Sequence, residues 1–398
     1  MKIAVYHNLP SGGAHRILHG LCRYLGDRHT VDVFTLETSD RTLRDEQVAS
    51  NLCVFPFQQR RPRPLHLYLN DLRRRMDLAD LERVNRRIAG EIDAAGYDLA
   101  FVEACRFTFA PAVLRYLKTP SVFYYNGSPG WLEGPEWNPP RSRLDAARRL
   151  LALPLELQLE RRLRRDDARN VRAADAVLTN SEHARRRIRD AYGVTARVCP
   201  PGVELLPAGD LPEQDYVLSL GSLENRKGFD FLVEALGRIE KARRPPLVLA
   251  CNGADPVVRR RLEDRAAGLG VRLRIELDVP DGPLSELYLG ATAFVYGSHH
   301  EPLGLAPLEA MAHRRPVVAV AEGGVPETVV DRQTGFLVPR DPARFAQALE
   351  ELLGDADLRR QMGEAGRAEV ERRWVWDVRG PGYEQEFRRI AGGEPAPP

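Results

Sequence analysis

The sequence predicts an α/β protein of two domains, each built on a parallel sheet that helices cover on both faces. Short apolar runs of the kind that form buried strands alternate with helical segments along the chain. The length of 398 residues is more than one ordinary hydrophobic core holds. A stretch rich in proline and glycine, 205–213, interrupts the alternation near the middle. It has no periodicity, and we therefore place the linker between the two domains there.

The first half of the chain begins with an apolar run at 3–7, a glycine-containing turn and a helical stretch at 14–25. Further runs of the strand type lie at 30–36, 52–57, 98–104, 121–125 and 176–179. Helical stretches are expected between them at 78–95, 108–117, 143–173 and 182–192. Pro154 lies inside the third of these helices. We expect it to break or bend that helix, because proline lacks the N–H that a helix interior needs.

The second half repeats the same alternation. Strands are expected at 216–220, 247–251, 271–277, 293–296 and 316–321. Helices are expected at 229–241, 257–269, 284–290, 305–312 and 342–353, with a last helical stretch from Trp374 to Ile390. The tail at 392–398 is expected to be disordered, as chain ends that nothing ties down commonly are.

Composition indicates a soluble globular protein. The chain is 43% hydrophobic and 29% charged, and no apolar run approaches the length that a bilayer span requires. The first residues form a strand rather than the apolar stretch and cleavage site of a signal peptide. Five cysteines lie far apart without a Cys-x-x-Cys pair, which favours reduced thiols over disulfides or zinc. We therefore expect a cytoplasmic protein.

Positive charge is concentrated in one region although the net charge is only +2. Residues 141–190 contain 14 arginines against 8 acidic residues, and 60–87 is also basic. The simplest interpretation is a set of solvated helix faces. The alternative is a surface for an anionic acceptor or for the inner face of an anionic membrane. Nucleic acid is not expected, because single-strand binders interleave aromatic with basic residues and none occurs between Arg141 and Val171.

The segment from Glu301 to Glu309 is the most informative for function. It holds two glutamates eight positions apart, separated by a turn with Gly304 and followed by a helix that starts near Leu305. A helix start offers free N–H groups that suit a phosphate. Carboxylates on either side of such a site could accept hydrogen bonds from the hydroxyls of a sugar and of a ribose. The alternative is a surface glutamate and a first-turn glutamate that only favours the helix dipole.

Two further motifs follow at fixed spacing, Gly323-Gly324-Val325-Pro326-Glu327 and Thr334-Gly335-Phe336-Leu337-Val338. Together with the paired glutamates, they resemble the carboxyl-terminal half of retaining glycosyltransferases of family four, which have the GT-B fold. The resemblance implies two doubly wound, Rossmann-like domains that face a central cleft. It implies an acceptor-side domain at 1–205, a nucleotide-sugar-binding domain at 213–373, and a terminal helix at 374–391 that crosses back to the first domain.

The resemblance also assigns candidate site residues. Lys227 matches the family lysine that neutralises the leaving diphosphate, and Arg226 is a second candidate because Ser222 replaces the family arginine. Many relatives have a histidine where this chain has Asn126, which could hydrogen-bond a hydroxyl but cannot shuttle a proton. The catalytic set is Glu301, Lys227, Arg226 and Asn126. The donor-binding set is Gly12, Gly13, Ser222, Asn252, Gly253, Val279, Leu303, Gly304, Leu305 and Glu309.

The implied reaction moves a sugar, with retention, from a nucleoside-diphosphate sugar to a hydroxyl of a glycan, a lipid-linked or a small-molecule acceptor. No cofactor and no metal are expected, because nothing resembles an Asp-x-Asp metal motif. Two alternatives remain open: a non-catalytic binder of nucleotide sugars, to which Ser222 and Asn126 point, and a sugar-nucleotide epimerase of the same fold. The sequence does not indicate the base, the sugar or the acceptor.

Overall fold

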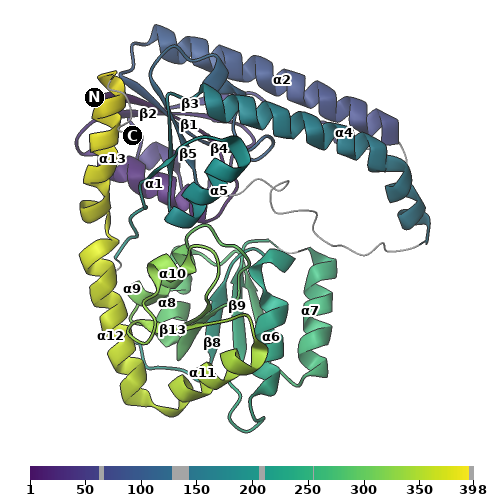
Figure 1. The fold of residues 1–398 in the computed structure, drawn as a ribbon, viewed down its shortest axis with the longest axis vertical. Coiled ribbons are helices and arrows are strands. Elements are labelled where there is room, and N and C mark those ends of the chain that lie inside the picture. The colour runs from purple at the N-terminus through teal and green to yellow at the C-terminus, as the bar shows by residue number, and fades with distance from the viewer. Residues whose placement is uncertain (62–66, 128–142, 206–210, 254, 394–398) are drawn as a thin grey trace. The chain divides into compact units, whose positions relative to one another are not determined.

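The computed structural model describes residues 1–61, 67–127, 143–205, 211–253 and 255–393 (Figure 1). The chain forms two compact units. The first comprises Met1–Thr179, Arg185–Cys199 and Pro381–Pro398, and the second comprises Asn180–Ala184 and Pro200–Gly380. Most of the expected linker, at 206–210, and the end of the expected tail, at 394–398, lie outside the described residues.

The first unit contains a sheet of seven strands in the order β3-β2-β1-β4-β5-β6-β7. The pairs from β3 to β7 are all parallel. The strands are β1 (Lys2–Asn8), β2 (Thr30–Leu36), β3 (Asn51–Phe55), β4 (Leu99–Cys105), β5 (Ser121–Tyr125), β6 (Ala176–Thr179) and β7 (Arg197–Val198). Strand order reverses between β1 and β4, which is the topological switch point of a doubly wound sheet.

The second unit repeats this design with six parallel strands in the order β10-β9-β8-β11-β12-β13. They are β8 (Val217–Leu220), β9 (Leu247–Cys251), β10 (Leu273–Leu277), β11 (Ala293–Tyr296), β12 (Val317–Val320) and β13 (Gly335–Val338). Here the switch point lies between β8 and β11. Two large apolar clusters, one on each face of this sheet, explain why its strands read as continuous apolar runs. The predicted fold class is confirmed.

Helices of the first unit are α1 (Gly13–Gly26), α2 (Leu67–Ala94), α4 (Arg143–Ala173) and most of α5 (Glu182–Tyr192), with the short 3-10 helices η1 (Asp45–Gln47) and η2 (Ala112–Arg115). The first residues of α5, up to Ala184, belong to the second unit. The helix expected at 108–117 was wrong, since only η2 forms there. Phe109 adopts a left-handed φ of 57° and Pro111 is extended, so the chain cannot enter a helix before Ala112.

Helices α2 and α4 also differ from expectation. α2 begins eleven residues earlier than predicted, and the side chains of Tyr68, Leu72 and Met76 in that extra stretch are exposed. α4 continues through Pro154 without a break. Leu150 and Pro154 are both exposed there, so water can replace the hydrogen bond that the proline removes.

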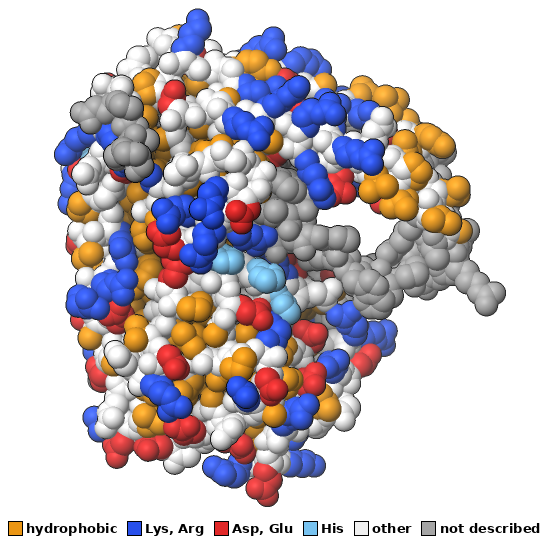
Figure 2. Space-filling model, in the orientation of Figure 1, with side chains coloured by type: hydrophobic (Ala, Val, Ile, Leu, Met, Phe, Trp, Pro, Cys, Tyr) orange, Lys and Arg blue, Asp and Glu red, His pale blue; other side chains and the backbone are white. Residues whose placement is uncertain are grey.

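The first third of α2 lies beside the middle of α4, where the Arg75 guanidinium donates to the Gln158 side chain at 2.8 Å. Both helices extend past the sheet of the first unit (Figure 1). Their outer ends carry a group of exposed apolar side chains that appears as an orange patch in Figure 2. We call this group the apolar tip; it comprises Tyr68, Leu72, Met76, Leu150, Leu151, Leu153 and Leu157.

Helices of the second unit are η3 (Asn225–Lys227), α6 (Phe229–Arg238), α7 (Pro256–Gly268), α8 (Asp281–Gly290), α9 (Leu305–Ala312), α10 (Val325–Thr328), α11 (Pro342–Gly354) and α12 (Ala356–Arg373). The last helix, α13 (Trp376–Ala391), starts in this unit and ends in the first one. Among the described helices, none combines the length and the apolar character needed to span a membrane.

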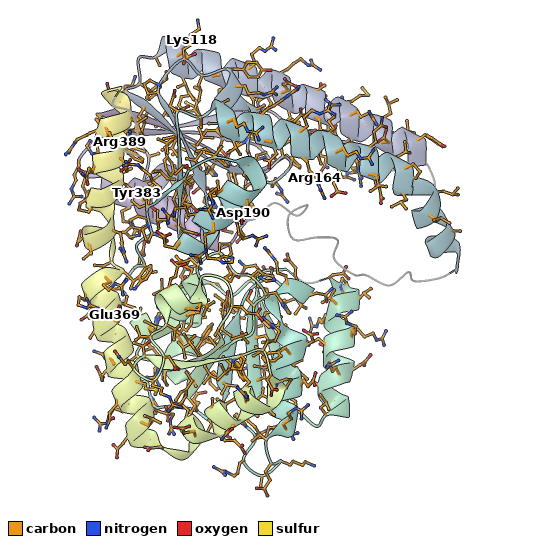
Figure 3. The ribbon with its side chains drawn as sticks, in the orientation of Figure 1. Lys118, Arg164, Asp190, Glu369, Tyr383 and Arg389 are labelled. Carbon is orange, nitrogen blue, oxygen red and sulfur yellow. The ribbon has the colours of Figure 1, made fainter. Side chains whose placement is uncertain are left out.

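The second half of α13 is bound to the first sheet through buried hydroxyl groups. Figure 3 shows Tyr383 on the side of α13 that faces the sheet. Its hydroxyl donates to the Cys199 carbonyl at 2.7 Å and lies 2.7 Å from the Tyr124 hydroxyl. The rings of Phe387 and Phe101 pack beside this pair. Aromatic packing and paired hydroxyls therefore explain why the end of the chain belongs to the first unit.

Candidate functional site

The candidate site of the second unit is built from two loops that leave neighbouring strands at the switch point. One loop, 221–228, follows β8, and the other, 297–304, follows β11. Ligands of doubly wound sheets bind outside the carboxyl ends of the strands at this position. Most of the residues singled out in the second half of the sequence lie on these two loops or at the start of α9, which follows the second loop.

The two loops contact each other through glycine backbone. Gly228 has a left-handed φ of 65°, and a Cβ atom placed on it would lie 2.0 Å from the Gly297 carbonyl oxygen. The His299 amide donates to the Arg226 carbonyl at 2.8 Å, which adds a hydrogen bond between the loops. Only glycine allows this close approach, so the two loops form one rigid surface.

We expect Gly228→Ala to destabilise the second unit, because the new methyl group would overlap the Gly297 carbonyl and alanine disfavours a positive φ. The free energy of unfolding should fall by roughly 2–4 kcal/mol. Denaturant unfolding measures this change. Gly268→Ala is the matched control, because a Cβ atom there meets nothing within 4 Å. Equal stability of the two variants would contradict the close approach.

Lys227 and Glu301 form an ion pair across the two loops. The Lys227 Nζ lies 2.8 Å from Oε2 of Glu301, and the Ser298 hydroxyl donates to the same oxygen at 2.8 Å. The side chains are 15% and 19% exposed, so the pair is shielded but within reach of a ligand. Burial alone would raise the pKa of Glu301, but the Lys227 charge, the hydrogen bonds from Lys227 and Ser298, and the Arg226 charge together lower that pKa to about 2. Glu301 is therefore an anion at any ordinary pH.

The Gly-Gly-x-Pro-Glu motif supports the backbone on which Glu301 stands. The Gly324 amide donates to the Glu301 carbonyl at 2.8 Å. Cβ atoms on Gly323 and Gly324 would lie 2.3 Å from the Glu301 carbonyl oxygen and 2.1 Å from that of Pro302. Glu327, at the end of the motif, accepts from the backbone amides of Glu182 and His183 at 2.8 Å each. The motif is thus a close-packed turn behind the site, and its glutamate caps the start of α5.

Arg340 is a further positioning residue that the sequence analysis missed. Its guanidinium donates to the carbonyls of Gly297 and Ser298 at 2.9 and 3.0 Å. It also forms a bidentate pair with Glu322, at 2.6 and 2.8 Å. Arg340 therefore fixes the backbone just before Glu301 to the turn that follows β12. The available signal was a basic residue two positions after the Thr-Gly-x-Leu-Val motif, which alone says nothing of its partners.

We expect Arg340→Ala to lower stability by about 2–3 kcal/mol, because it removes charge-assisted hydrogen bonds and leaves buried carbonyls unpaired. Activity should fall as well, because the segment that carries Ser298 and Glu301 loses its support. Arg344→Ala, at an exposed position on α11, is the control. Thermal unfolding and initial rates measure both effects. If the two arginine variants behaved alike, Arg340 would have no positioning role.

Helix α9 starts at Leu305, and its N-cap Gly304 has a φ of 98°. Leu303 is buried in the core, which anchors the turn before the helix. Glu309 lies one turn inside the helix, and the Tyr288 hydroxyl donates to its Oε2 at 2.9 Å. The Tyr288 ring stacks on His313 at a centroid distance of 4.9 Å. The amides of the first turn of α9 and a well-oriented carboxylate therefore lie on the same helix.

The remaining predicted residues of this unit lie on adjacent loops. Asn252 and Gly253 follow β9 and are exposed, and the Gly253 amide donates to Asp278 at 3.1 Å. Val279 follows β10 and packs partly against the core. Arg226 pairs with Glu224 at 3.5 Å, and Ser222 lies half-buried near the start of the same loop. Direct contact joins Lys227 with Glu301, and the Arg226 charge also helps to lower the pKa of Glu301.

The other three candidates belong to the first unit. Gly12 is the N-cap of α1 with a φ of 141°, and a Cβ atom on it would meet nothing within 4 Å. Gly13 is exposed at the first position of that helix. Asn126 directly follows β5 and is half-buried. Gly12 and Gly13 follow β1, so they lie at the switch point of the first sheet.

Comparisons with known proteins agree on one family for both units. Residues 208–369 match the family described as glycosyl transferases group 1, and residues 11–205 match glycosyltransferase family 4. The chain is 33% identical to a D-inositol 3-phosphate glycosyltransferase of Geodermatophilus obscurus, covering 68% of each protein. It is 32% identical to a GDP-mannose-dependent alpha-(1-6)-phosphatidylinositol monomannoside mannosyltransferase of Mycolicibacterium smegmatis, covering 61% of this chain and 70% of that protein.

Among solved structures, the fold resembles sucrose-phosphate synthase from Thermosynechococcus elongatus. The TM-score is 0.74 at 21% sequence identity, and the match covers 99% of this chain and 100% of that one. At this level of identity the likeness concerns the fold alone. It identifies the two doubly wound sheets as the two halves of a GT-B fold.

Proposed function

We propose, from the premise that this chain belongs to the retaining glycosyltransferases of family 4 (group 1), that its acceptor is a phosphate-bearing hydroxyl compound of the inositol class. The chain is a GT-B enzyme that transfers a sugar from a nucleoside-diphosphate sugar to a hydroxyl. The proposal on the acceptor rests on the two relatives described above, one named for an inositol phosphate and the other for a phosphatidylinositol mannoside. GDP-mannose, named for the second relative, is the donor to test first.

The proposed mechanism uses the second unit to hold the donor. Charge develops on the diphosphate as the glycosidic bond breaks, and fixed positive groups lower the barrier by stabilising that charge. Lys227, the amides at the start of α9 and, more weakly, Arg226 would supply them. Glu301 would accept a hydrogen bond from a hydroxyl of the transferred sugar, and Glu309 from the ribose hydroxyls. Ser222, Asn252, Gly253 and Val279 would contribute to the surface around the nucleotide.

Proton transfer in the proposed mechanism does not need a protein base. The acceptor oxygen forms a bond to the anomeric carbon while the bond from that carbon to the diphosphate oxygen breaks, on the same face of the sugar. The acceptor proton moves to the departing phosphate oxygen. This step tolerates Asn126, which cannot shuttle a proton. We propose that Asn126 donates a hydrogen bond to a sugar hydroxyl and that no metal takes part in the transfer.

One observation carries this proposal: the contact between Lys227 and Glu301 at the switch point of the second sheet. In this proposal, Lys227 would be the cation for the phosphate, and Glu301 beside it would be the acceptor for the sugar. The experiment is a transfer assay with UDP-, GDP- and ADP-sugars against inositol phosphates and against a simple polyol. NMR of the anomeric proton would show whether configuration is retained. Binding of nucleotide sugar without turnover on any of these acceptors would favour a binding protein over an enzyme and overturn the proposal.

We expect Glu309→Gln to raise the KM for the donor roughly tenfold with little change in kcat, because one charge-assisted hydrogen bond to the ribose is lost. Tyr288 can still donate to the remaining amide oxygen, so the helix should keep its structure. Glu351→Gln, on the exposed side of α11, serves as the control. A fall in kcat at unchanged KM would contradict a ribose-binding role.

We further propose that the first unit contacts an anionic membrane through α2 and α4, on the cytoplasmic side. The apolar tip supplies side chains that can enter the headgroup region, and Leu150 and Leu151 are 71% and 69% exposed. Arginines follow on the same helices, among them Arg73, Arg74, Arg161, Arg164 and Arg165; Figure 3 shows Arg164 on α4. Five free cysteines fit a reducing compartment.

Vesicle sedimentation tests this contact. The wild type should bind vesicles with anionic lipid more strongly than neutral ones, and salt should weaken binding. A Leu150→Ser/Leu151→Ser double variant should bind less, while transfer to a water-soluble acceptor should not change. Equal binding by the double variant would show that the tip does not enter the bilayer.

A further inference from the structure

A buried cluster of two histidines and one aspartate lies in the first unit, apart from every residue of the proposed mechanism. It consists of His7 at the end of β1, His15 in the first turn of α1 and Asp45 in η1. Nε2 of His7 lies 3.0 Å from one carboxylate oxygen of Asp45, and Nε2 of His15 lies 2.9 Å from the other. Both histidine side chains are fully buried, and that of Asp45 is 7% exposed.

The local structure directs all three side chains to one point. Successive side chains of β1 alternate between faces, so Tyr6 packs in the core on one side of the sheet and His7 points to the other. His15 follows Gly12 and Gly13 on the first turn of α1. Arg44 has a left-handed φ of 49°, which turns the chain so that Asp45 points inward between exposed neighbours. Strand, helix and loop therefore converge here although they are distant in sequence.

The chemistry of this set is that of a metal ligand group. A carboxylate taken out of water needs a partner of opposite charge, and neutral imidazoles supply hydrogen bonds but no charge. Two imidazoles and a carboxylate are ligands that zinc accepts in proteins. The three ligating atoms all lie within 4.8 Å of one another. Ligands about 2.0–2.2 Å from a tetrahedral ion are roughly 3.4 Å apart. An ion would therefore lengthen the two histidine–aspartate contacts of 3.0 and 2.9 Å and draw the more widely separated ligand atoms together.

The surroundings fit a structural ion. The Ser39 hydroxyl lies 3.4 Å from Nδ1 of His7 and also contacts the Leu9 carbonyl at 3.2 Å. Such a contact to the second ring nitrogen orients a metal-binding histidine. Asp45 lies between the exposed residues Arg44 and Glu46, which gives an ion a short path from solvent. The competing explanation is a proton: one imidazole carries the positive charge, and no metal is bound.

We propose that His7, His15 and Asp45 bind one divalent metal ion of the zinc class. The ion would tie the end of β1 and the loop around Asp45 to the start of α1, and so fix the turn at Gly12 and Gly13. Its role would be structural, because the groups proposed to act on the donor diphosphate lie in the second unit.

The test measures metal content and stability of the full chain without an affinity tag. After dialysis, elemental analysis should find roughly one zinc-class ion per chain, and Asp45→Asn and His15→Gln should each lose most of it. A strong chelator should lower the Tm of the wild type by several degrees, and added zinc should restore it. The control is His29→Gln, in the same unit but outside the cluster; it should keep the metal. Cobalt substituted for zinc should give visible absorption bands in the wild type and in His29→Gln, but not in Asp45→Asn or His15→Gln.

Two outcomes would overturn the proposal. The first is a wild type that contains no metal and whose Tm responds to neither chelator nor zinc, which would establish the protonated hydrogen-bonded cluster. The second is metal uptake that Asp45→Asn and His29→Gln share equally, which would mean adventitious binding elsewhere. A loss of stability in Asp45→Asn does not by itself support the ion, because a broken hydrogen-bonded pair has the same effect. Metal content and the cobalt spectrum therefore decide.

Discussion

A Lys227→Met enzyme is expected to lose roughly 100- to 1,000-fold in kcat, because the group proposed to stabilise charge on the leaving diphosphate is gone. Methionine keeps most of the apolar stem, which packs over Gly221 with closest approaches near 3.0 Å to a Cβ position there. Folding should therefore survive. Initial rates at saturating donor measure the loss, and circular dichroism checks the fold.

Lys241→Met is the matched control, since Lys241 is exposed at the end of the segment that follows α6. It should keep the rate of the wild type. Arginine at position 227 should restore part of the rate, because it returns the charge with a different geometry. A Lys227→Met enzyme with an unchanged kcat would remove Lys227 from the mechanism.

A Glu301→Ala enzyme is expected to lose a comparable factor, roughly 100-fold or more in kcat/KM, and to lose stability as well. The substitution removes the acceptor for the sugar hydroxyl and also leaves Lys227 and the Ser298 hydroxyl without their shared partner. Glu301→Gln separates the two effects, since it keeps the shape and one acceptor oxygen while losing the charge. Steady-state kinetics with the full donor and with a donor lacking one sugar hydroxyl measure the transfer contribution.

The pH dependence of stability tests the same ion pair. The pKa of Glu301 is lowered from the usual value near 4.5 to about 2, so its ionised form stabilises the fold. This contribution is complete above about pH 4.5 and is lost as the pH falls through about 2. The difference in unfolding free energy between wild type and Glu301→Gln should therefore narrow below pH 4.5. A constant difference down to pH 2 would show that the pair does not stabilise the fold.

Much of the fold was predictable because the buried strands are short, continuous apolar runs between recognisable turns. The predicted strands at 30–36, 121–125, 247–251 and 293–296 form with those bounds. Helices were predicted less well where burial does not determine the spacing of their apolar residues. The first part of α2 exposes its apolar residues and so lacks an amphipathic signal. Ala356–Arg373 forms α12 although no helix is predicted there. At 108–117, backbone constraints around Phe109 and Pro111 outweighed helix propensity.

The candidate site was predictable residue by residue but not as a set of contacts. Motif spacing singled out Lys227 and Glu301 separately, yet the ion pair between them depends on β8 and β11 being neighbours. The role of Arg340 depends on three partners that lie far from it in sequence. The same holds for His7, His15 and Asp45, whose spacing resembles no metal-binding motif. Tertiary packing creates these contacts, and a single sequence does not show which distant residues will become partners.

The ion pair of Lys227 with Glu301 bears on how fast the spent nucleotide would leave the site. A donor diphosphate that paired with the Lys227 ammonium group would deprive the Glu301 carboxylate of its counterion. In the proposed mechanism, a complete sugar nucleotide would compensate this loss with a sugar hydroxyl, whereas the spent nucleotide would not. Glu301 would then compete with the spent nucleotide for the Lys227 ammonium group, so re-formation of the ion pair would speed product release.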